Sequence, residues 1–239
     1  MNEELPTLIG LLNLPNLPGL SRHDTLFVEH TWVAMLAVIV VLLITAINMK
    51  KIPGLFQNAI ELIVGFLESF IEKIIGPNGN IFFPLVATVF FFIIFANYLG
   101  LVPGFMAPTG SINTTAAWAI LIFLTYNAAG IIKHGFSYVK QFLGPIWWLA
   151  PIMFPMEILS HLIRPVSLGM RLYANMLAGE TIIGLLFFSV CMVGAPVIWM
   201  LWESLITCWF QGFVFSMLTM VYLGGAVGAA DHGPSPKHA

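Results

Sequence analysis

Charged residues are scarce in this sequence of 239 residues. Only 8% are Asp, Glu, Lys or Arg, whereas 59% are hydrophobic, and the mean hydropathy is +0.94. A soluble domain carries about a quarter charged residues. The composition therefore excludes an ordinary soluble protein and predicts an all-α integral membrane protein. With a net charge of −2, the chain also lacks the basic surplus that nucleic-acid binding requires.

Cysteines and basic leader residues are also missing. The two cysteines, Cys191 and Cys208, provide neither a disulfide framework nor a metal-ligand pattern, and no cofactor or metal site is predicted. The first residues read Asn2-Glu3-Glu4-Leu5, acidic where a signal or transit peptide would be basic. We therefore expect the first span to act as its own insertion signal. This favours a bacterial plasma membrane, although an organelle-encoded chain would look similar.

Long apolar runs set the expected organisation. Residues 31–49 form a 19-residue run, about 28 Å long as a helix, which is enough for one crossing. We predict five transmembrane helices, at residues 31–49, 81–102, 115–132, 146–190 and 197–223. They form one membrane domain (31–223) between an extracytoplasmic N-terminal segment (1–30) and a flexible cytoplasmic tail (224–239).

The fourth of these runs is too long for one upright helix. Residues 146–190 stay largely apolar for about 45 residues, whereas an upright span needs about 20. Pro151, Pro155, Pro165 and Gly169 interrupt the run. It is therefore either two short passes or a lead-in followed by one long, tilted helix. We favour the second course, which gives a long tilted helix pair at the C-terminal end.

Residues 55–75 have a different pattern. Glu61, Glu68 and Glu72 fall within about 40° of one another on a helical wheel, with Gln57 beside them. This predicts an amphipathic interfacial helix lying on the membrane surface, with a packing role.

Loop charges indicate the orientation. If the N-terminus is outside and residues 146–190 cross once, Arg22 is the only basic side chain outside. Six basic side chains then fall inside: Lys50, Lys51, Lys73, Lys133, Lys140 and Lys237. The positive-inside rule therefore favours N-out, C-in and five crossings. A double pass by 146–190 would move only Lys237 outside.

Polar groups concentrate in the last two apolar regions, where Arg171 is the most informative residue. A charge at the centre of a membrane helix costs about 2.5–3.5 kcal/mol on insertion scales, so it marks a functional site by default. The candidate residues of these regions are Glu157, Ser160, His161, Arg164, Arg171, Asn175, Glu180, Glu203, Ser204, Thr207 and Gln211.

Helical spacing arranges these candidates. Glu157 and His161 share a face that Arg171 and Asn175 extend, whereas Glu180 lies about 180° around from Arg171. The Glu157–His161 pair suits a proton relay, a simple hydrogen bond or, without a third ligand, a weak metal site. Arg171 itself has one structural alternative, an internal salt bridge to Glu180 or Glu203.

The chemistry of arginine limits what the site can do. A proton cannot pass the guanidinium, because arginine stays protonated at any relevant pH and repels a cation. Carboxylates and hydroxyls reach Arg171 from both ends of the helix pair, which suggests two aqueous half-pathways separated by its charge. Transfer between them requires a mobile anionic carrier, and this sequence does not contain one.

Four segments carry a resemblance to a known family. The run Arg-Pro-Val-Ser-Leu-Gly-Met-Arg-Leu-Tyr-Ala-Asn-Met-Leu-Ala-Gly-Glu at 164–180 resembles the signature of subunit a of bacterial F-type ATP synthases. Residues 51–61, 112–115 and 211–223 resemble other segments of that family. The likeness extends from about residue 30 to 225.

This resemblance implies a stator subunit beside a rotating ring of c subunits, each with a membrane carboxylate. Arg171 would pair with that carboxylate and block a direct proton leak. Asn175 and Gln211 would flank the arginine. Glu180 and the acid of the last helix would line the outer half-channel, and Glu157 and Ser160 the inner one. The family also implies the peripheral-stalk b subunit as a partner, and no enzyme activity of this chain alone.

Two features depart from the family pattern. The acid or histidine of the last helix usually stands seven residues before the glutamine, but here Ser204 holds that place. Glu203 is eight residues before, which in a regular helix rotates it by about 100° from the expected position. The family often pairs a histidine with a glutamate in the outer path, whereas this chain has two glutamates there. The nearest membrane histidine is His161, on the inner side, and its role stays open.

A secondary transporter with a midplane charged site is the alternative from another class. It predicts internal repeats, and we find none, since the polar groups occupy one half of the chain only. The sequence leaves the coupling ion, H⁺ or Na⁺, and the ring size open.

Overall fold

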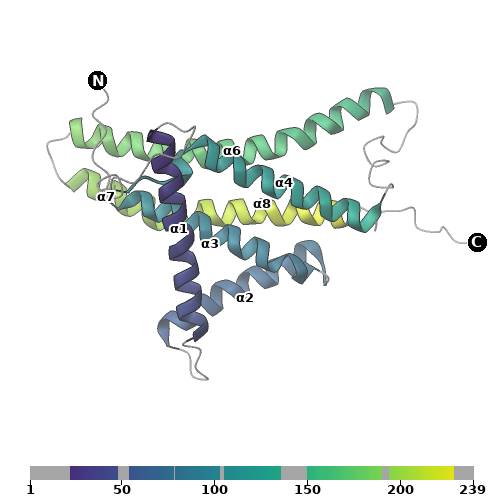
Figure 1. The fold of residues 1–239 in the computed structure, drawn as a ribbon, viewed down its shortest axis with the longest axis horizontal. Coiled ribbons are helices and arrows are strands. Elements are labelled where there is room, and N and C mark those ends of the chain that lie inside the picture. Colours follow the sequence, from purple (N-terminus) through teal and green to yellow (C-terminus); the bar gives the residue numbers. More distant parts are fainter. Residues whose placement is uncertain are drawn as a thin grey trace, which may run out of the picture.

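The computed structural model describes residues 22–47, 54–77, 79–102, 105–135, 150–189 and 194–228, and within them it is helical. The loop lysines Lys50, Lys51 and Lys140, the tail with Lys237, and Cys191 lie outside the described residues. The helices are α1 (Arg22–Ile47), α2 (Leu55–Ile75), α3 (Phe83–Leu101), α4 (Ile112–His134), α6 (Ala150–Ser189), α7 (Gly194–Trp202) and α8 (Cys208–Gly228), drawn in Figure 1. Short turns are η2 (Gly79–Phe82), η3 (Pro108–Gly110) and η5 (Glu203–Thr207).

Among the residues that the structure describes, four helical segments are long and apolar enough to cross a membrane: Asp24–Ile47, Gly79–Leu101, Ile112–Lys133 and Cys208–Val227. The predicted all-α class is confirmed, and these segments overlap four of the five predicted spans. The first helix begins at Arg22, nine residues before the predicted span. The polar residues before Thr31 end the apolar run, but they do not end the helix. Thr25, Leu26, Phe27 and His30 in this extension are buried. The last helix likewise continues to Gly228, past the predicted boundary at 223.

The long run at 146–190 forms one helix over its described part. Helix α6 has 40 residues, about 60 Å, and contains Pro155 and Pro165. Prolines remove a backbone hydrogen bond and bend a helix without necessarily ending it, and α6 bends along its length in Figure 1. Of the two courses open from the sequence, the structure has the single long helix, about twice the length of an upright span.

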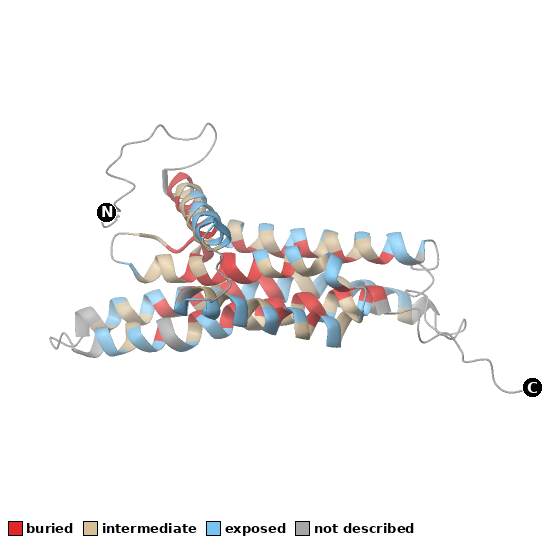
Figure 2. Cartoon of the chain, turned by 90° about the horizontal axis from the view of Figure 1, so that it is seen from below, coloured by how far each residue is buried: buried red, intermediate tan, exposed pale blue. Residues whose placement is uncertain are grey.

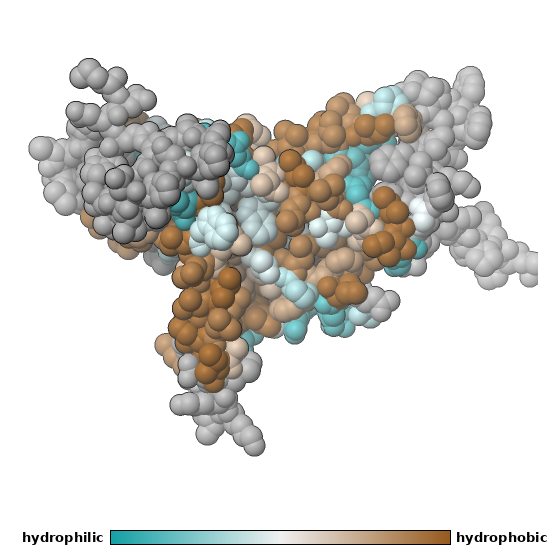
Figure 3. Space-filling view, viewed as in Figure 1, coloured by the Kyte–Doolittle hydropathy of each residue, from teal (hydrophilic) through white to brown (hydrophobic). Residues whose placement is uncertain are grey.

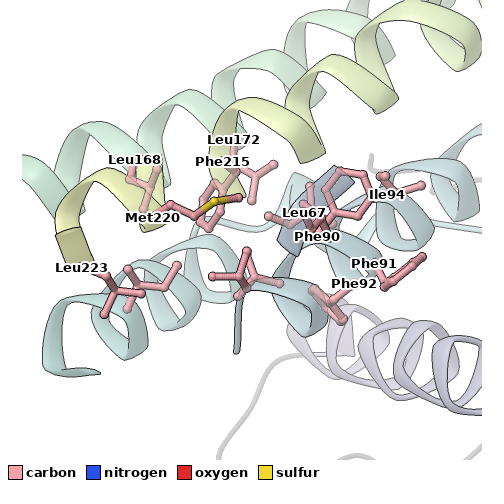
Figure 4. Packing of buried hydrophobic residues seen from close by; sticks show 14 of the residues in the cluster. Leu67, Phe90, Phe91, Phe92, Ile94, Leu168, Leu172, Phe215, Met220 and Leu223 are labelled. Carbon is pink, nitrogen blue, oxygen red and sulfur yellow. The ribbon is translucent and has the colours of Figure 1, made fainter. Parts of the chain in front are cut away.

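The core lies where α3, α4, α6 and α8 meet. Helix α8 packs mainly against α3 and α4, and α6 packs against α4. Phe90, Leu172, Phe215 and Met220 belong to one buried cluster (Figure 4). Figure 2 shows the buried positions along the inner faces of these helices. The four helices therefore form the rigid body that carries the polar residues of α6 and α8.

Glycines bring two helix pairs of this body close together. A Cβ on Gly212 of α8 would lie 2.6 Å from Cγ1 of Ile94 in α3, and one on Gly169 of α6 would lie 3.4 Å from the Thr115 carbonyl oxygen of α4. Small residues allow backbones to approach in this way in membrane helices, where close packing replaces the hydrophobic effect.

Helix α2 presents its predicted acidic stripe to the outside. Glu61, Glu68 and Glu72 are exposed, whereas Leu67 and Ile71 are fully buried. The buried side packs against α8 and α3. The two faces fit the predicted amphipathic helix, and its place at the membrane surface stays a prediction.

Helix α1 packs against α3 and η3, and Ala34 and Val38 belong to the core cluster. In Figure 1 it crosses α6 and α8 steeply, and Figure 3 shows its far part as an apolar projection. Large apolar side chains from Met35 to Ile47 are exposed. An exposed apolar helix surface of this kind is stable only in lipid or against a partner.

Exchange of Gly212 for valine is expected to destabilise the fold. Gly212→Val places side-chain atoms into Ile94 at the α3–α8 contact, and overpacking of this kind costs about 1–3 kcal/mol. The matched control is Gly225→Val in the same helix, because a Cβ there meets nothing within 4 Å. Thermal unfolding in detergent would show a lower midpoint for Gly212→Val only. Equal midpoints for the two variants would contradict the close approach.

Candidate functional site

Arg171 lies on the outside of the bundle. Its side chain is exposed, whereas the neighbouring Leu172 is buried next to Phe215 of α8 (Figure 4). Arg171 makes no ion pair within the described part of the chain. The internal salt bridge to Glu180 or Glu203, an alternative from the sequence, is therefore absent. The helix directs its central charge away from the protein's own core.

The surface around Arg171 is apolar. Val166, Met170 and Leu177 on the same helix are each exposed by more than two fifths. Large apolar side chains are also exposed on α7, namely Val197, Ile198, Leu201 and Trp202, whereas the exposed Ile206, Trp209 and Phe210 line a pocket beside α2 and α3. A fixed charge thus stands among exposed apolar side chains of α6, and it is unstable in lipid unless another charge or water meets it.

Two carboxylates lie beyond Arg171 along α6: Glu203 of η5 approaches Gly179 of α6, and Glu180 of α6 approaches Gly110 of η3. Glu203 is only 4% exposed, and a Cβ on Gly179 would lie 2.8 Å from its Oε1. Glu180 is exposed, and its Oε1 would lie 3.4 Å from a Cβ on Gly110 of η3. The structure therefore brings Glu180 and Glu203, 23 residues apart in sequence, to the same end of α6.

Helices α7 and α8 are joined by a π turn that changes the expected direction of Glu203. The amide of Cys208 donates to the carbonyl oxygen of Glu203, five residues earlier, and the hydroxyl of Thr207 donates to the Glu203 carboxylate. Glu203 and Gln211 are both buried, with Gln211 6% exposed. The rotation expected for Glu203 assumed a regular helix, and Glu203–Thr207 is instead a π turn. The side chain of Ser204 lies outside what the structure describes.

Three buried polar residues in or near η3, the turn beside Glu180, are not among the candidates from the sequence. The Thr109 hydroxyl donates to Oδ1 of Asn97 at 2.7 Å, and both side chains are buried. His30 is fully buried, with Nδ1 2.6 Å from the carbonyl oxygen of Leu26 and its ring edge against Phe105. Single uncharged polar residues are common in membrane helices, so the sequence provides no signal that singles these out.

A second polar cluster lies on the other side of Arg171 along α6. His161 Nε2 is 3.5 Å from Oε1 of Glu157, and its Nδ1 is 3.4 Å from the hydroxyl of Tyr126 in α4. The Arg164 guanidinium lies 5.5 Å from the ring centroid of Tyr222 in α8, and the Tyr126 and Tyr222 rings are 6.0 Å apart. Three helices therefore contribute to this cluster.

The spacing of α6 predicted the Glu157–His161 contact of this cluster. The sequence gave no reason to join Tyr126 to it, because the tyrosine lies 35 residues earlier and on another helix. Of the remaining candidates, Ser160 is exposed and Asn175 is half-buried. Among the described residues, no three His, Cys, Asp or Glu side chains are placed to hold a metal ion.

Comparisons with known proteins agree on one family. A family model described as ATP synthase A chain matches residues 28–224. ATP synthase subunit a of Trichlorobacter lovleyi is 43% identical over 214 residues, which cover 90% of this chain and 92% of the relative. ATP synthase subunit a of Geobacter sulfurreducens is 41% identical over 200 residues, 84% and 86% of the two chains. ATP synthase subunit a 3 of Pelobacter propionicus is 42% identical over 208 residues, 87% and 90%.

Loss of the Thr109 hydroxyl is expected to weaken the fold beside Glu180. Thr109→Val leaves Oδ1 of Asn97 buried without this hydrogen bond, which costs about 1–3 kcal/mol. The control is Thr88→Val, since the exposed Thr88 hydroxyl bonds only the Pro84 carbonyl of its own helix. Thermal unfolding would separate the two variants. An unchanged midpoint for Thr109→Val would show that the buried bond contributes nothing.

Proposed function

The chain belongs to the ATP synthase subunit a family, the proton-translocating subunit of the enzyme's membrane sector, and on that premise we propose that Arg171 is its gate. In this proposal two half-channels deliver protons to, and remove them from, carboxylates of a rotating c-ring. The charge of Arg171 separates the half-channels. The chain has no catalytic role of its own and acts within the rotary complex.

The observation that carries the proposal is the exposed, unpaired Arg171 on an apolar face. A guanidinium in the membrane requires an anion or water, and within the described residues the chain supplies no ion-pair partner. A c-ring carboxylate has the required charge. The pair forms when the carboxylate is deprotonated and separates when a proton neutralises it. Because arginine keeps its charge, a proton cannot pass between the half-channels without the ring.

The outer half-channel is assigned to the end of α6 near η3. Glu203 lies against Gly179 of α6, and the next residue, Glu180, directs its carboxylate toward Gly110 of η3, which supports one path served by both acids. Asn175 lies one turn from Arg171 on α6, and Gln211 lies on α8; we assign them to the flanks of the gate. The assignment of Ser204 to the proton pathway stays a prediction.

The inner half-channel is assigned to the polar cluster around His161, on the N-terminal side of Arg171 along α6. Glu157, Ser160 and His161 are its proposed members. The contacts of His161 with Glu157 on one nitrogen and with Tyr126 on the other support a relay, because an imidazole accepts a proton at one nitrogen and releases one from the other.

The proposed topology has the N-terminus outside, the C-terminus in the cytoplasm, and α6 as the fourth of five crossings, strongly tilted. The length of α6 and the steep crossing of α1 over α6 and α8 in Figure 1 support the tilt. Helix α2 lies at the cytoplasmic interface of a bacterial plasma membrane. The family implies a complex with other ATP synthase subunits; the c-ring and the peripheral-stalk b subunit are the proposed contacts.

Removal of the gate charge is the central test. Arg171→Ala in membrane vesicles is expected to abolish ATP-driven proton pumping and ATP synthesis, because a deprotonated ring carboxylate then has no cation to meet. Met170→Ala, which truncates the neighbouring exposed side chain without changing charge, is the control and should pump at nearly the wild-type rate. Persistence of pumping or synthesis near the wild-type rate in Arg171→Ala would refute the gate.

Neutralisation of Glu157 tests the inner path. Glu157→Gln keeps the shape of the side chain but removes the acid that contacts His161, so pumping is expected to slow while the complex still assembles. Glu68→Gln, at an exposed acid of α2, is the matched control and should not slow it. Pumping rate and the amount of subunit in the membrane are measured together. Loss of the protein from the membrane would instead indicate a structural role for Glu157.

A further inference from the structure

The distance from Glu203 to Gln211 does not suit a regular α-helix. Eight residues turn an α-helix by about 800°, which is about 80° beyond two full turns. The residue seven before Gln211, Ser204, would turn by about 700° and fall nearly in line with it. A regular helix would therefore align Ser204 with Gln211 and turn Glu203 aside.

The π turn removes this mismatch. A bond from an amide to a carbonyl five residues earlier places one extra residue in the turn, and the Cys208-to-Glu203 bond is of that kind. One extra residue offsets about 100° of rotation. Glu203 and Gln211 consequently return to one side of the helix, and both are buried. One α-turn and one π turn together take up the eight residues.

The π turn also directs the Glu203 carboxylate to a gap in α6. Residue 179 is glycine, and a Cβ there would come within 2.8 Å of Oε1 and 3.1 Å of the carboxyl carbon. The Thr207 hydroxyl, within the same turn, donates to the carboxylate. The carboxylate is thus held between its own helix and the backbone of α6, next to Glu180.

The side-chain amide of Gln211, two turns further along α8, has N–H groups without an acceptor among the described residues. Its Nε2 is buried. Two helical turns, about 11 Å, separate Gln211 from Glu203, which is too far for a direct bond. A buried polar atom of this kind is normally satisfied, and a short file of water between the two side chains would satisfy it.

We propose that the π turn at Glu203–Thr207 is a positioning device. It places Glu203, and not Ser204 seven residues before Gln211, as the last-helix carboxylate of the outer half-channel. Gly179 of α6 is the receptacle, the space that receives this carboxylate. This rests on the proposed function, since it specifies which acid serves that path. The π turn accommodates the one extra residue between Glu203 and Gln211, so the Glu203 carboxylate keeps its position relative to Gln211 and α6.

The register is tested by two variants in the intact ATP synthase. The exchange E203S/S204E keeps the composition but moves the acid by one residue, and we expect ATP-driven pumping to fall roughly tenfold or more, because small misplacements of a reacting group are costly. Deletion of Leu205, within the π turn, leaves seven residues from Glu203 to Gln211. A straight α-helix then aligns them, so about half or more of the pumping should remain. Normal pumping by the exchanged chain, or complete loss in an assembled deletion variant, overturns the proposal.

The receptacle is tested by matched glycine variants of α6. Gly179→Ala puts a methyl group into the carboxylate's place and should reduce pumping, whereas Gly184→Ala, where a Cβ meets nothing within 4 Å, should not. The shorter acid in Glu203→Asp, combined with Gly179→Ala, should restore part of the lost rate. A purely structural role for Gly179 would give no such rescue. Normal pumping by Gly179→Ala, or absence of rescue in an assembled complex, contradicts the receptacle.

Failure of this proposal is distinguishable from failure of the proposed function. If Arg171→Ala pumps normally, the gate is wrong whatever the Glu203 variants do. If Arg171→Ala is inactive but Glu203→Gln pumps at the wild-type rate, the gate stands and the assignment of Glu203 is overturned. Assembly of each variant is checked by the amount of subunit that co-purifies with the rest of the complex.

Discussion

A polar or charged group inside a bilayer must be met by protein, by water or by another charge, and this constraint governs the molecule. Outside α6 and α8, the described helices have few polar side chains, and their hydroxyls mostly donate to carbonyl oxygens of their own helix, so the constraint is easily met. Helix α6 meets it in two ways. Glu157 and His161 find partners within the protein, whereas Arg171 stands exposed without an ion-pair partner in the described chain. In the proposed function, this unmet requirement at Arg171 connects the fold to a second protein.

Helix packing determines which polar groups are met and which are not. Close contacts at Gly169 and Gly212 bind α6 and α8 to the α3–α4 pair on one side. The opposite sides of α6 and α7 keep large apolar residues exposed, with Arg171 among them. A membrane protein that buried all its interfaces internally would not leave such a face. The same packing thus closes the core and leaves exposed the surface that the proposed function assigns to the ring.

Helical phase is the second quantity on which the site depends. A side chain on a helix changes direction by about 100° for each residue, so one residue too many between two polar groups is enough to separate them. The π turn at Glu203 corrects the phase locally and leaves the rest of α8 regular. Gly179 on the facing helix leaves room for the carboxylate. Two backbone features, neither of which carries a charge, thereby place the acid.

The sequence by itself determined the membrane class and most of the helices, and it singled out Arg171 as the candidate gate, because hydropathy and the cost of a buried charge depend on composition along one chain. It also determined the Glu157–His161 contact, since residues four apart meet on any α-helix. Only the tertiary structure placed Tyr126 beside His161, Asn97 beside Thr109 and Glu203 beside Gly179. These pairs depend on how helices cross and on one non-α turn, which spacing along a regular helix does not contain. The exposure of Arg171 belongs to the same group, because only packing fixes which side of a helix faces inward.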